Sequence, residues 1–174
     1  MTLKARLSTE RAGRRLVMPY IEKLAEHQQY LVLPSIGEAD QNKDTCRELQ
    51  RFGDIFVQLK NGQMETIELK TERANKHGNL FIVVWANKPS GSNPGRSGWL
   101  YTSKADVLLY TFLSPKEIYR LEFQPFKRWF EDHVNEFEEK VNWKNSQKNV
   151  IVGKVVPIER ILREGFLKQI PAPE

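Results

Sequence analysis

The stretch that decides the fold is Gly53-Asp54-Ile55-Phe56-Val57-Gln58-Leu59-Lys60-Asn61-Gly62-Gln63-Met64-Glu65-Thr66-Ile67-Glu68-Leu69-Lys70. Two apolar-rich runs flank a single Asn-Gly pair, and both of these residues tolerate the positive φ that tight turns need. The pattern predicts a β-hairpin with Asp54 near one outer end and Glu68 and Lys70 near the other. The hairpin brings three charged side chains together, and the pairing register decides whether they share a face.

Two registers are compatible with the Asn-Gly pair. Side chains directly opposite each other point to the same face, and a slip of one residue reverses this. A two-residue loop would place Asp54 opposite Leu69, with the two acids on opposite faces. A three-residue loop over 60–62, closed by a left-handed glycine in a G1 bulge, pairs Leu59 with Gln63 and places Asp54 opposite Glu68.

We predict the three-residue loop because of what it does to the other face. Lys70 then joins the two acids, and the opposite face becomes an apolar surface suited to a core. The residues of that apolar face are Ile55, Val57, Leu59, Ile67 and Leu69.

This arrangement resembles the active-site motif of the PD-(D/E)XK nuclease superfamily, which is an acidic residue followed, on the next strand, by an acidic-apolar-lysine tripeptide. The motif stands here as Gly53-Asp54 and Glu68-Leu69-Lys70, with glycine in place of the motif's proline. The resemblance covers roughly residues 8 to 112 and extends to small phage and mobile-element nucleases and to Holliday-junction resolvases. A salt-bridged patch on an exposed sheet face is the alternative interpretation.

By this resemblance, Asp54 and Glu68 bind a divalent metal, the carbonyl of Leu69 adds a ligand, and Lys70 orients the attacking water. The chemistry agrees with the residue types. Magnesium prefers oxygen ligands and keeps several waters, so two acids and one carbonyl suffice, and Mn²⁺ can substitute. A metal held in this way stabilises charge on phosphate oxygens and supplies hydroxide near neutral pH.

Glu10 is a further candidate for the metal centre. The first thirty residues show helical periodicity, and Glu10 lies on the wheel in line with Val17 and Ile21, which predicts that it faces the sheet. Related nucleases carry an acidic residue on their first helix that reaches the metal. Pro19 should kink or restart the helix. A solvated first-turn glutamate favoured by the helix dipole is the alternative.

Composition is compatible with a nucleic-acid partner. The chain has 174 residues, a formal net charge of +5 and one cysteine, Cys46, so an internal disulfide and a cysteine-rich zinc site are excluded. The length favours a single domain over residues 1–174. No apolar run is long enough for a signal peptide or membrane span, so we expect a cytoplasmic protein of a bacterial, archaeal or phage-infected cell, with no membrane partner.

Four basic residues are candidates for contacts with DNA: Arg14, Lys88, Arg96 and Lys104. Residues 86–98 form a long loop rich in turn residues, which either closes over a DNA backbone or is simply flexible. Trp99 and Tyr101 could stack on an unpaired base, although aromatics at this spacing are more often core residues. Polar residues between 35 and 53 either line the cleft or face solvent: Asp40, Asp44, Arg47 and Arg51.

The remaining pattern predicts a helix, a strand at 31–33, the hairpin, a strand at 80–85 that is buried on both faces and joins the sheet of the hairpin, and a hairpin over 107–123. A helix over 124–140, with an acidic side facing away from DNA, a polar connection over 141–149, a last strand at 150–156 and a helix at 158–162 complete it. This order indicates α/β or α+β with a mixed β-sheet flanked by helices. It is compatible with the restriction-endonuclease-like core.

The sequence therefore predicts a magnesium-dependent DNA endonuclease centred on Asp54, Glu68 and Lys70, with Glu10 as a weaker fourth residue. Three roles stay open: resolvase of Holliday junctions or branched DNA, restriction-type or phage-borne nuclease, and repair enzyme. The small size favours structure-selective cutting, since little chain remains for reading bases. A homodimer would suit a resolvase. The alternative is a non-catalytic nucleic-acid-binding protein that retains the fold.

Overall fold

The computed structural model describes residues 3–34, 48–144 and 149–172, and the protein is of the α+β class. The elements in chain order are α1 (Leu3–Leu24), β1 (Ala25–Val32), β2 (Ile55–Leu59), β3 (Met64–Glu72), β4 (Asn79–Asn87), β5 (Arg96–Ser97), α3 (Trp99–Thr102), β6 (Val107–Phe112), β7 (Glu117–Glu122), α4 (Phe123–His133), a 3-10 turn (Val134–Glu136), β8 (Glu138–Lys144), β9 (Asn149–Pro157), α5 (Ile158–Arg163) and β10 (Leu167–Ile170).

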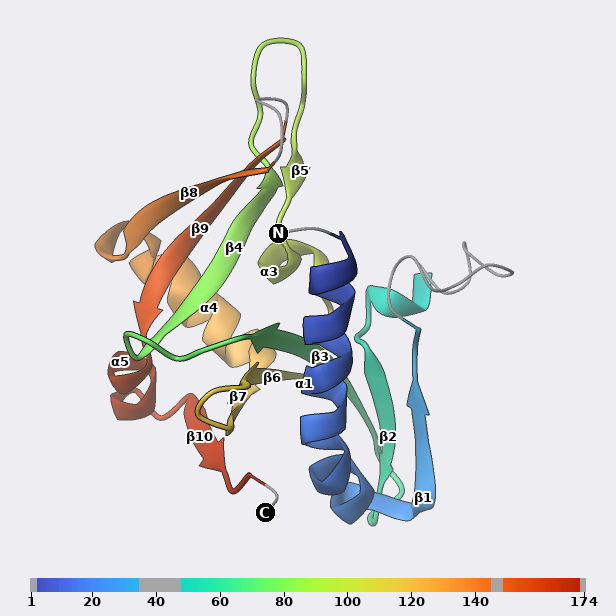
Figure 1. Ribbon diagram of the computed structural model, residues 1–174. Coiled ribbons are helices and arrows are strands. Elements are labelled where there is room, and N and C mark those ends of the chain that lie inside the picture. The colour runs from blue at the N-terminus through green and yellow to red at the C-terminus, as the bar shows by residue number, and fades with distance from the viewer. Residues whose placement is uncertain (1–2, 35–47, 145–148, 173–174) are drawn as a thin grey trace.

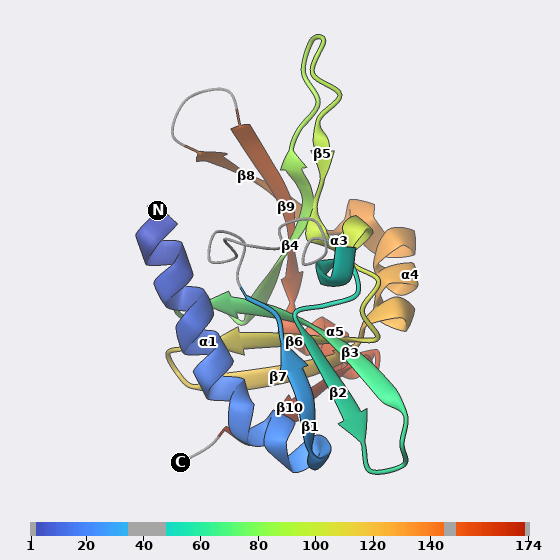
Figure 2. The ribbon, with the colours of Figure 1, turned by 90° about the vertical axis from the view of Figure 1, so that its right-hand side faces the viewer.

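The main sheet has six strands in the order β1-β2-β3-β6-β7-β10. It is mixed, because β3 and β6 are parallel while the other neighbouring strands are antiparallel. Figure 2 shows α1 on one side of this sheet and α4 on the other. The chain leaves β3, forms β4, β5 and α3, and returns to place β6 beside β3. The residues ahead of β6 thereby come close to the centre of β3.

The predicted register of the first hairpin is confirmed. Ile55 pairs with Ile67 and Gln58 with Met64, so by continuation Asp54 lies opposite Glu68. The amide of Leu59 donates to the carbonyl of Gln63 at 2.8 Å, and Gly62 has φ +80°. This is the three-residue loop with a left-handed glycine.

Two hydrophobic clusters cover the two faces of the main sheet. α1 contributes Leu16, Val17 and Ile21 to the first cluster, where they pack with strand residues such as Ile67 and Leu69. Strand β6 is buried along its whole length and supplies alternate residues to both clusters. α1 continues through Pro19 as one helix, so of the two predicted effects of Pro19, a kink or a restart, the restart is wrong.

The strand predicted at 80–85 forms, but it does not join the main sheet as expected. β4 belongs to a second, antiparallel sheet with the order β5-β4-β9-β8. Its burial alternates, with Leu80, Ile82 and Val84 in the core, so it is not buried on both faces. A continuous apolar run indicates a strand but does not identify its partner. In Figure 1 this sheet lies beside the main one, and its β4–β5 end projects from the molecule.

Other corrections concern strands at sheet edges. β1 begins at Ala25 rather than 31, the predicted helix over 124–140 ends at His133, and β8 (Glu138–Lys144) contains the first residues of the predicted polar connection over 141–149. β10, at Leu167–Ile170, was not predicted at all. Each of these strands lies at an edge. Edge strands carry polar residues and lack apolar alternation, which is why the pattern did not indicate them.

No helix among the described residues is long and apolar enough to cross a membrane.

Candidate metal and phosphodiester site

The ends of β2 and β3 hold the predicted charged residues in place. Asp54 immediately precedes β2, and its Oδ2 accepts a hydrogen bond of 2.9 Å from the amide of Leu69. Beyond Ile67 strand β3 has no ladder partner on β2, so the Asp54 carboxylate takes the place of that partner. The carbonyl of a strand residue leaves the chain on the same side as its amide. The Leu69 carbonyl is therefore directed to the Asp54 side of the strand.

Gly53 explains the departure from the motif's proline. Its φ is +143°, and a Cβ at this position would lie 2.7 Å from the carbonyl oxygen of Ile67. Proline fixes φ at about −65° and adds ring atoms, so both the positive φ and the close carbonyl oxygen exclude proline at this position. The glycine lets the chain pass close to β3 immediately before Asp54.

Glu68 is buried, with 6% of its surface exposed. One carboxylate oxygen forms an ion pair with Lys70 Nζ, and the other accepts a 3.0 Å hydrogen bond from Ser103 Oγ. Burial raises the pKa of the Glu68 carboxyl, opposed by the Lys70 ammonium and reinforced by the Asp54 carboxylate. A carboxylate held in this way is stabilised by any further positive charge that reaches it.

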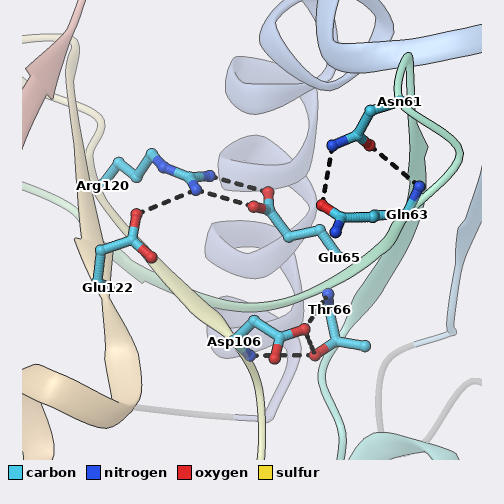
Figure 3. A network of polar contacts seen from close by, with 7 residues as sticks. All are labelled: Asn61, Gln63, Glu65, Thr66, Asp106, Arg120 and Glu122. Atoms are coloured by element: carbon cyan, nitrogen blue, oxygen red, sulfur yellow. Dashed lines mark hydrogen bonds and ion pairs between the residues drawn. The ribbon is translucent and has the colours of Figure 1, made fainter.

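Ser103 is positioned by contacts between β3 and the segment ahead of β6. The side chain of Asp106 accepts hydrogen bonds from the amide of Thr66 at 2.9 Å and from its hydroxyl at 2.7 Å, as Figure 3 shows. The amide of Ala105 donates to Ser103 Oγ at 3.3 Å, and Gln124 donates to the Ala105 carbonyl at 2.9 Å. These contacts fix the serine next to Glu68.

Lys70 projects from the same face of β3 as Glu68, two residues further along. Its side chain is 28% exposed, and Nζ lies 5.3 Å from the centroid of the Trp99 ring. Burial acts to lower the pKa of Lys70, but the carboxylates of Glu68, Asp54 and Glu10 outweigh it and raise that pKa. The lysine is therefore a cation at neutral pH in this arrangement.

The opposite face of β3 carries a separate ion pair. Arg120 of β7 donates to both carboxylate oxygens of Glu65, at 2.9 and 2.8 Å, and also contacts Glu122 at 3.2 Å (Figure 3). Glu65 differs in parity from Glu68, so this pair belongs to the side of the sheet that α1 covers. The pair supports the sheet and is separate from the site.

A pocket of about 500 Å³ opens over the charged cluster. The residues that line it are Thr9, Glu10, Arg14, Gln50, Arg51, Asp54, Glu68, Leu69, Lys70, Thr71, Val83, Ala86, Arg96, Ser97, Trp99, Thr102 and Ser103. The pocket thus contains the whole predicted catalytic set, including Glu10 from α1, together with two of the four basic candidates, Arg14 and Arg96.

The other two basic candidates do not line this pocket. Lys88 Nζ lies 3.6 Å from a carboxylate oxygen of Glu139 on β8. Lys104 lies outside the pocket, with Nζ 5.5 Å from the centroid of the Phe52 ring. Among the polar residues considered between 35 and 53, Arg51 lines the pocket, whereas Asp40, Asp44 and Arg47 lie outside the described residues.

The donor set suits a magnesium or manganese ion, although it is small. Within residues 3–34, 48–144 and 149–172, no group of three or more His, Cys, Asp or Glu side chains is placed to hold a metal. Asp54 lies opposite Glu68 by continuation of the β2–β3 pairing, and the Leu69 carbonyl is directed to the Asp54 side of the strand. These are oxygen ligands, which magnesium prefers, with waters completing its shell.

The sequence pattern gave no indication that Ser103 belongs to the site. The contact between Ser103 and Glu68 joins positions 35 residues apart and depends on β6 running parallel to β3, which the sequence pattern did not indicate. Trp99 is half-buried against the core, as the core interpretation predicts, whereas Tyr101 is exposed and does not follow it.

Comparison with protein-family models, with curated proteins and with solved structures finds no match to this chain.

Proposed function

We propose that this protein is a metal-dependent endonuclease that hydrolyses phosphodiester bonds in DNA. One observation carries the proposal: the hairpin register sets Asp54 opposite Glu68, with Lys70 on the same face, inside one pocket. The resemblance to the nuclease motif requires Asp54, Glu68 and Lys70 to lie on one face of the hairpin. The register with a two-residue loop would have placed the two acids on opposite faces. The mixed sheet flanked by helices is compatible with the restriction-endonuclease-like core that the motif implies.

In this proposal Asp54, Glu68 and the Leu69 carbonyl hold a magnesium or manganese ion. That ion would stabilise charge on the phosphate oxygens and supply hydroxide near neutral pH. Lys70 would orient the attacking water and offset negative charge on the phosphate, while Ser103 keeps the Glu68 carboxylate in place. Glu10 would assist from α1. The guanidinium groups of Arg14 and Arg96, and that of Arg51, would contact the DNA backbone.

The basic lining supports a phosphate substrate over a neutral one. Arg14, Arg51 and Arg96 enter the same pocket as the acidic pair, so the pocket offers both a cation site and an anion site. A phosphodiester with its metal carries both charges.

The alternative function, a non-catalytic nucleic-acid-binding protein, has one observation in its favour. Both Glu68 oxygens already have partners, Lys70 and Ser103, so the carboxylate is satisfied without a metal. Such a protein would bind DNA through the same arginines and would have no cleavage to lose.

Cleavage of a panel of DNAs separates the two. Linear duplex, single-stranded, flapped and four-way-junction substrates are incubated with magnesium, with manganese and with a chelator. The proposed nuclease cuts at least one substrate only when metal is present, and Lys70→Ala loses cleavage while it largely keeps DNA binding. Binding without cleavage of any substrate in either metal would support the alternative.

Sedimentation of the same samples tests the expected homodimer. The cytoplasmic location stays a prediction.

A further inference from the structure

Two exposed aromatic residues stand next to pocket-lining residues in the chain. Phe52 is 44% exposed and Tyr101 is 41% exposed. Single exposed hydrophobic residues are ordinary on protein surfaces, so the position of these two is what needs an explanation. Their chain neighbours Arg51 and Thr102 line the pocket, so both aromatic residues directly adjoin pocket-lining residues in the chain.

A lysine accompanies each of the two rings. Lys104 Nζ lies 5.5 Å from the centroid of Phe52, and Lys127 Nζ lies 5.6 Å from the centroid of Tyr101. Aromatic rings beside cations are the combination with which proteins hold single-stranded nucleic acid, the ring for a base and the cation for a phosphate. A docking surface for another protein has no comparable need for one cation per ring.

The chain segments that carry the rings are joined to each other. The amide of Lys104 donates to the carbonyl of Arg51 at 2.6 Å, which joins the segment ahead of β2 to the segment that follows α3. α3 is itself held tightly on β4, because a Cβ at Gly98 would lie 2.0 Å from the Val83 carbonyl oxygen. The rings therefore stand on a fixed support, which lowers the entropic cost of binding.

We propose that Phe52 and Tyr101 form a binding surface for unpaired nucleotides beside the pocket, with Lys104 and Lys127 binding the phosphates. The further claim that the bound strand is cut rests on the proposed nuclease function. Bases within a duplex are stacked on their neighbours and present only their edges, so these rings can stack only on unpaired bases. The substrate would then be DNA with a single-stranded stretch next to the cut, such as a flap, a gap or a free strand.

Acidic residues limit the path of the strand. Glu131 of α4 lies close enough to Tyr101 to raise the pKa of that residue, after the larger effect of burial. Glu131 and Asp132 are both exposed residues of α4. The strand would therefore contact Tyr101 on the side of Lys127 rather than that of Glu131, and would run from there over Lys104 and Phe52 towards the pocket.

The test is binding without cleavage. Fluorescence anisotropy in a chelating buffer compares a labelled oligothymidylate with a duplex of the same length. Phe52→Ala and Tyr101→Ala should each weaken binding of the oligothymidylate by about five- to a hundredfold, since a base stacked on an aromatic ring typically contributes this much. Duplex binding should change by less than about twofold, because phosphate contacts dominate it.

Three further variants serve as controls. Phe52→Tyr keeps an aromatic face and should restore binding, whereas Phe52→Leu keeps apolar area only and should not. Leu162→Ala removes a side chain of similar exposure, 42%, from α5 and should leave binding unchanged. Thermal unfolding of each variant shows that the fold is intact.

The outcomes distinguish this inference from the proposed nuclease. If the alanine variants bind the oligothymidylate as tightly as the unmodified protein, or if the unmodified protein does not bind it, the surface is not a stacking surface and the inference fails. Metal-dependent cleavage of plain duplex would then leave the nuclease standing. Ring-dependent binding with no cleavage of any DNA would support the surface and count against the nuclease.

Discussion

The carboxylate of Asp54 accepts a 2.9 Å hydrogen bond from the backbone amide of Leu69, across the ends of the two strands of the first hairpin. This bond helps to hold Asp54 opposite Glu68. It uses one carboxylate oxygen of Asp54, and the other oxygen does not bind this amide. The same residue thus continues the strand pairing and supplies a charge to the pocket.

Asp54→Asn separates these two roles. The amide oxygen of asparagine can still accept from Leu69, so thermal stability should change little, but the negative charge is lost. We expect cleavage to fall by at least about 100-fold, because even outer contacts of metal sites typically cost about 10- to 100-fold. Magnesium titration of cleavage measures this. Full activity at ordinary magnesium concentrations would mean that Asp54 is not a ligand.

Ser103→Ala tests the support of Glu68. Loss of the Ser103 hydroxyl removes the 3.0 Å hydrogen bond to the carboxylate and should raise the magnesium concentration needed for half-maximal cleavage by about 10-fold or more. Thr102→Ala is the matched control, because Thr102 also lines the pocket but donates to the Gly98 carbonyl. An equal effect of both variants would argue for a general disturbance of α3.

Arg120→Met should destabilise the fold without affecting the site. The Arg120 and Glu65 side chains are 17% and 13% exposed, so removal of one partner leaves a largely buried charge. We expect a loss of about 2 to 4 kcal/mol in the free energy of unfolding, near the lower end for buried pairs. Urea denaturation measures the free energy of unfolding of Arg120→Met. Comparison with the double variant Glu65→Gln/Arg120→Met shows how much of the loss comes from the unpaired Glu65 carboxylate. A loss below about 1 kcal/mol would show that the pair behaves as a surface pair.

The hairpin illustrates what the sequence could predict. Asn61-Gly62 fixed the turn, and the parity of apolar residues selected one register, so the position of Asp54, Glu68 and Lys70 followed from local pattern alone. The pocket around them could not be predicted in the same way. It needs β6 beside β3 and the diversion of β4 into a second sheet, and these pairings join distant residues.

The missed strands have a common physical reason. β8 contains Glu138, Glu139 and Lys140, which indicate a solvated segment, and it pairs along only one edge. A strand at an edge is held by main-chain hydrogen bonds to one neighbour and needs few apolar side chains. Hydrophobic periodicity, which identified the central strands, is weak there.

The pH dependence of stability should report Glu72. Burial raises the pKa of Glu72 above its ordinary value of 4.5, opposed by the Tyr110 hydroxyl that donates to its carboxylate. Between 4.5 and the raised pKa the folded protein holds a proton that the unfolded chain has released, so stability falls as pH rises through that window. Below the window this contribution is constant.

Glu72→Gln removes this titration. Relative to the variant, the unmodified protein should lose stability as pH rises from about 4 upwards and then level off. Urea midpoints at a series of pH values measure the difference. A difference that does not change with pH, or that grows in favour of the unmodified protein, would mean that the Glu72 pKa is not raised.

The most direct test of the account is single-turnover cleavage by Glu68→Gln, with Glu72→Gln as the matched control. Both changes replace a glutamate on the same face of β3, but only Glu68 lines the pocket. We expect Glu68→Gln to reduce metal-dependent cleavage by at least about 100-fold, whereas Glu72→Gln should retain it. Equal cleavage by the two variants would contradict a metal site at Asp54 and Glu68.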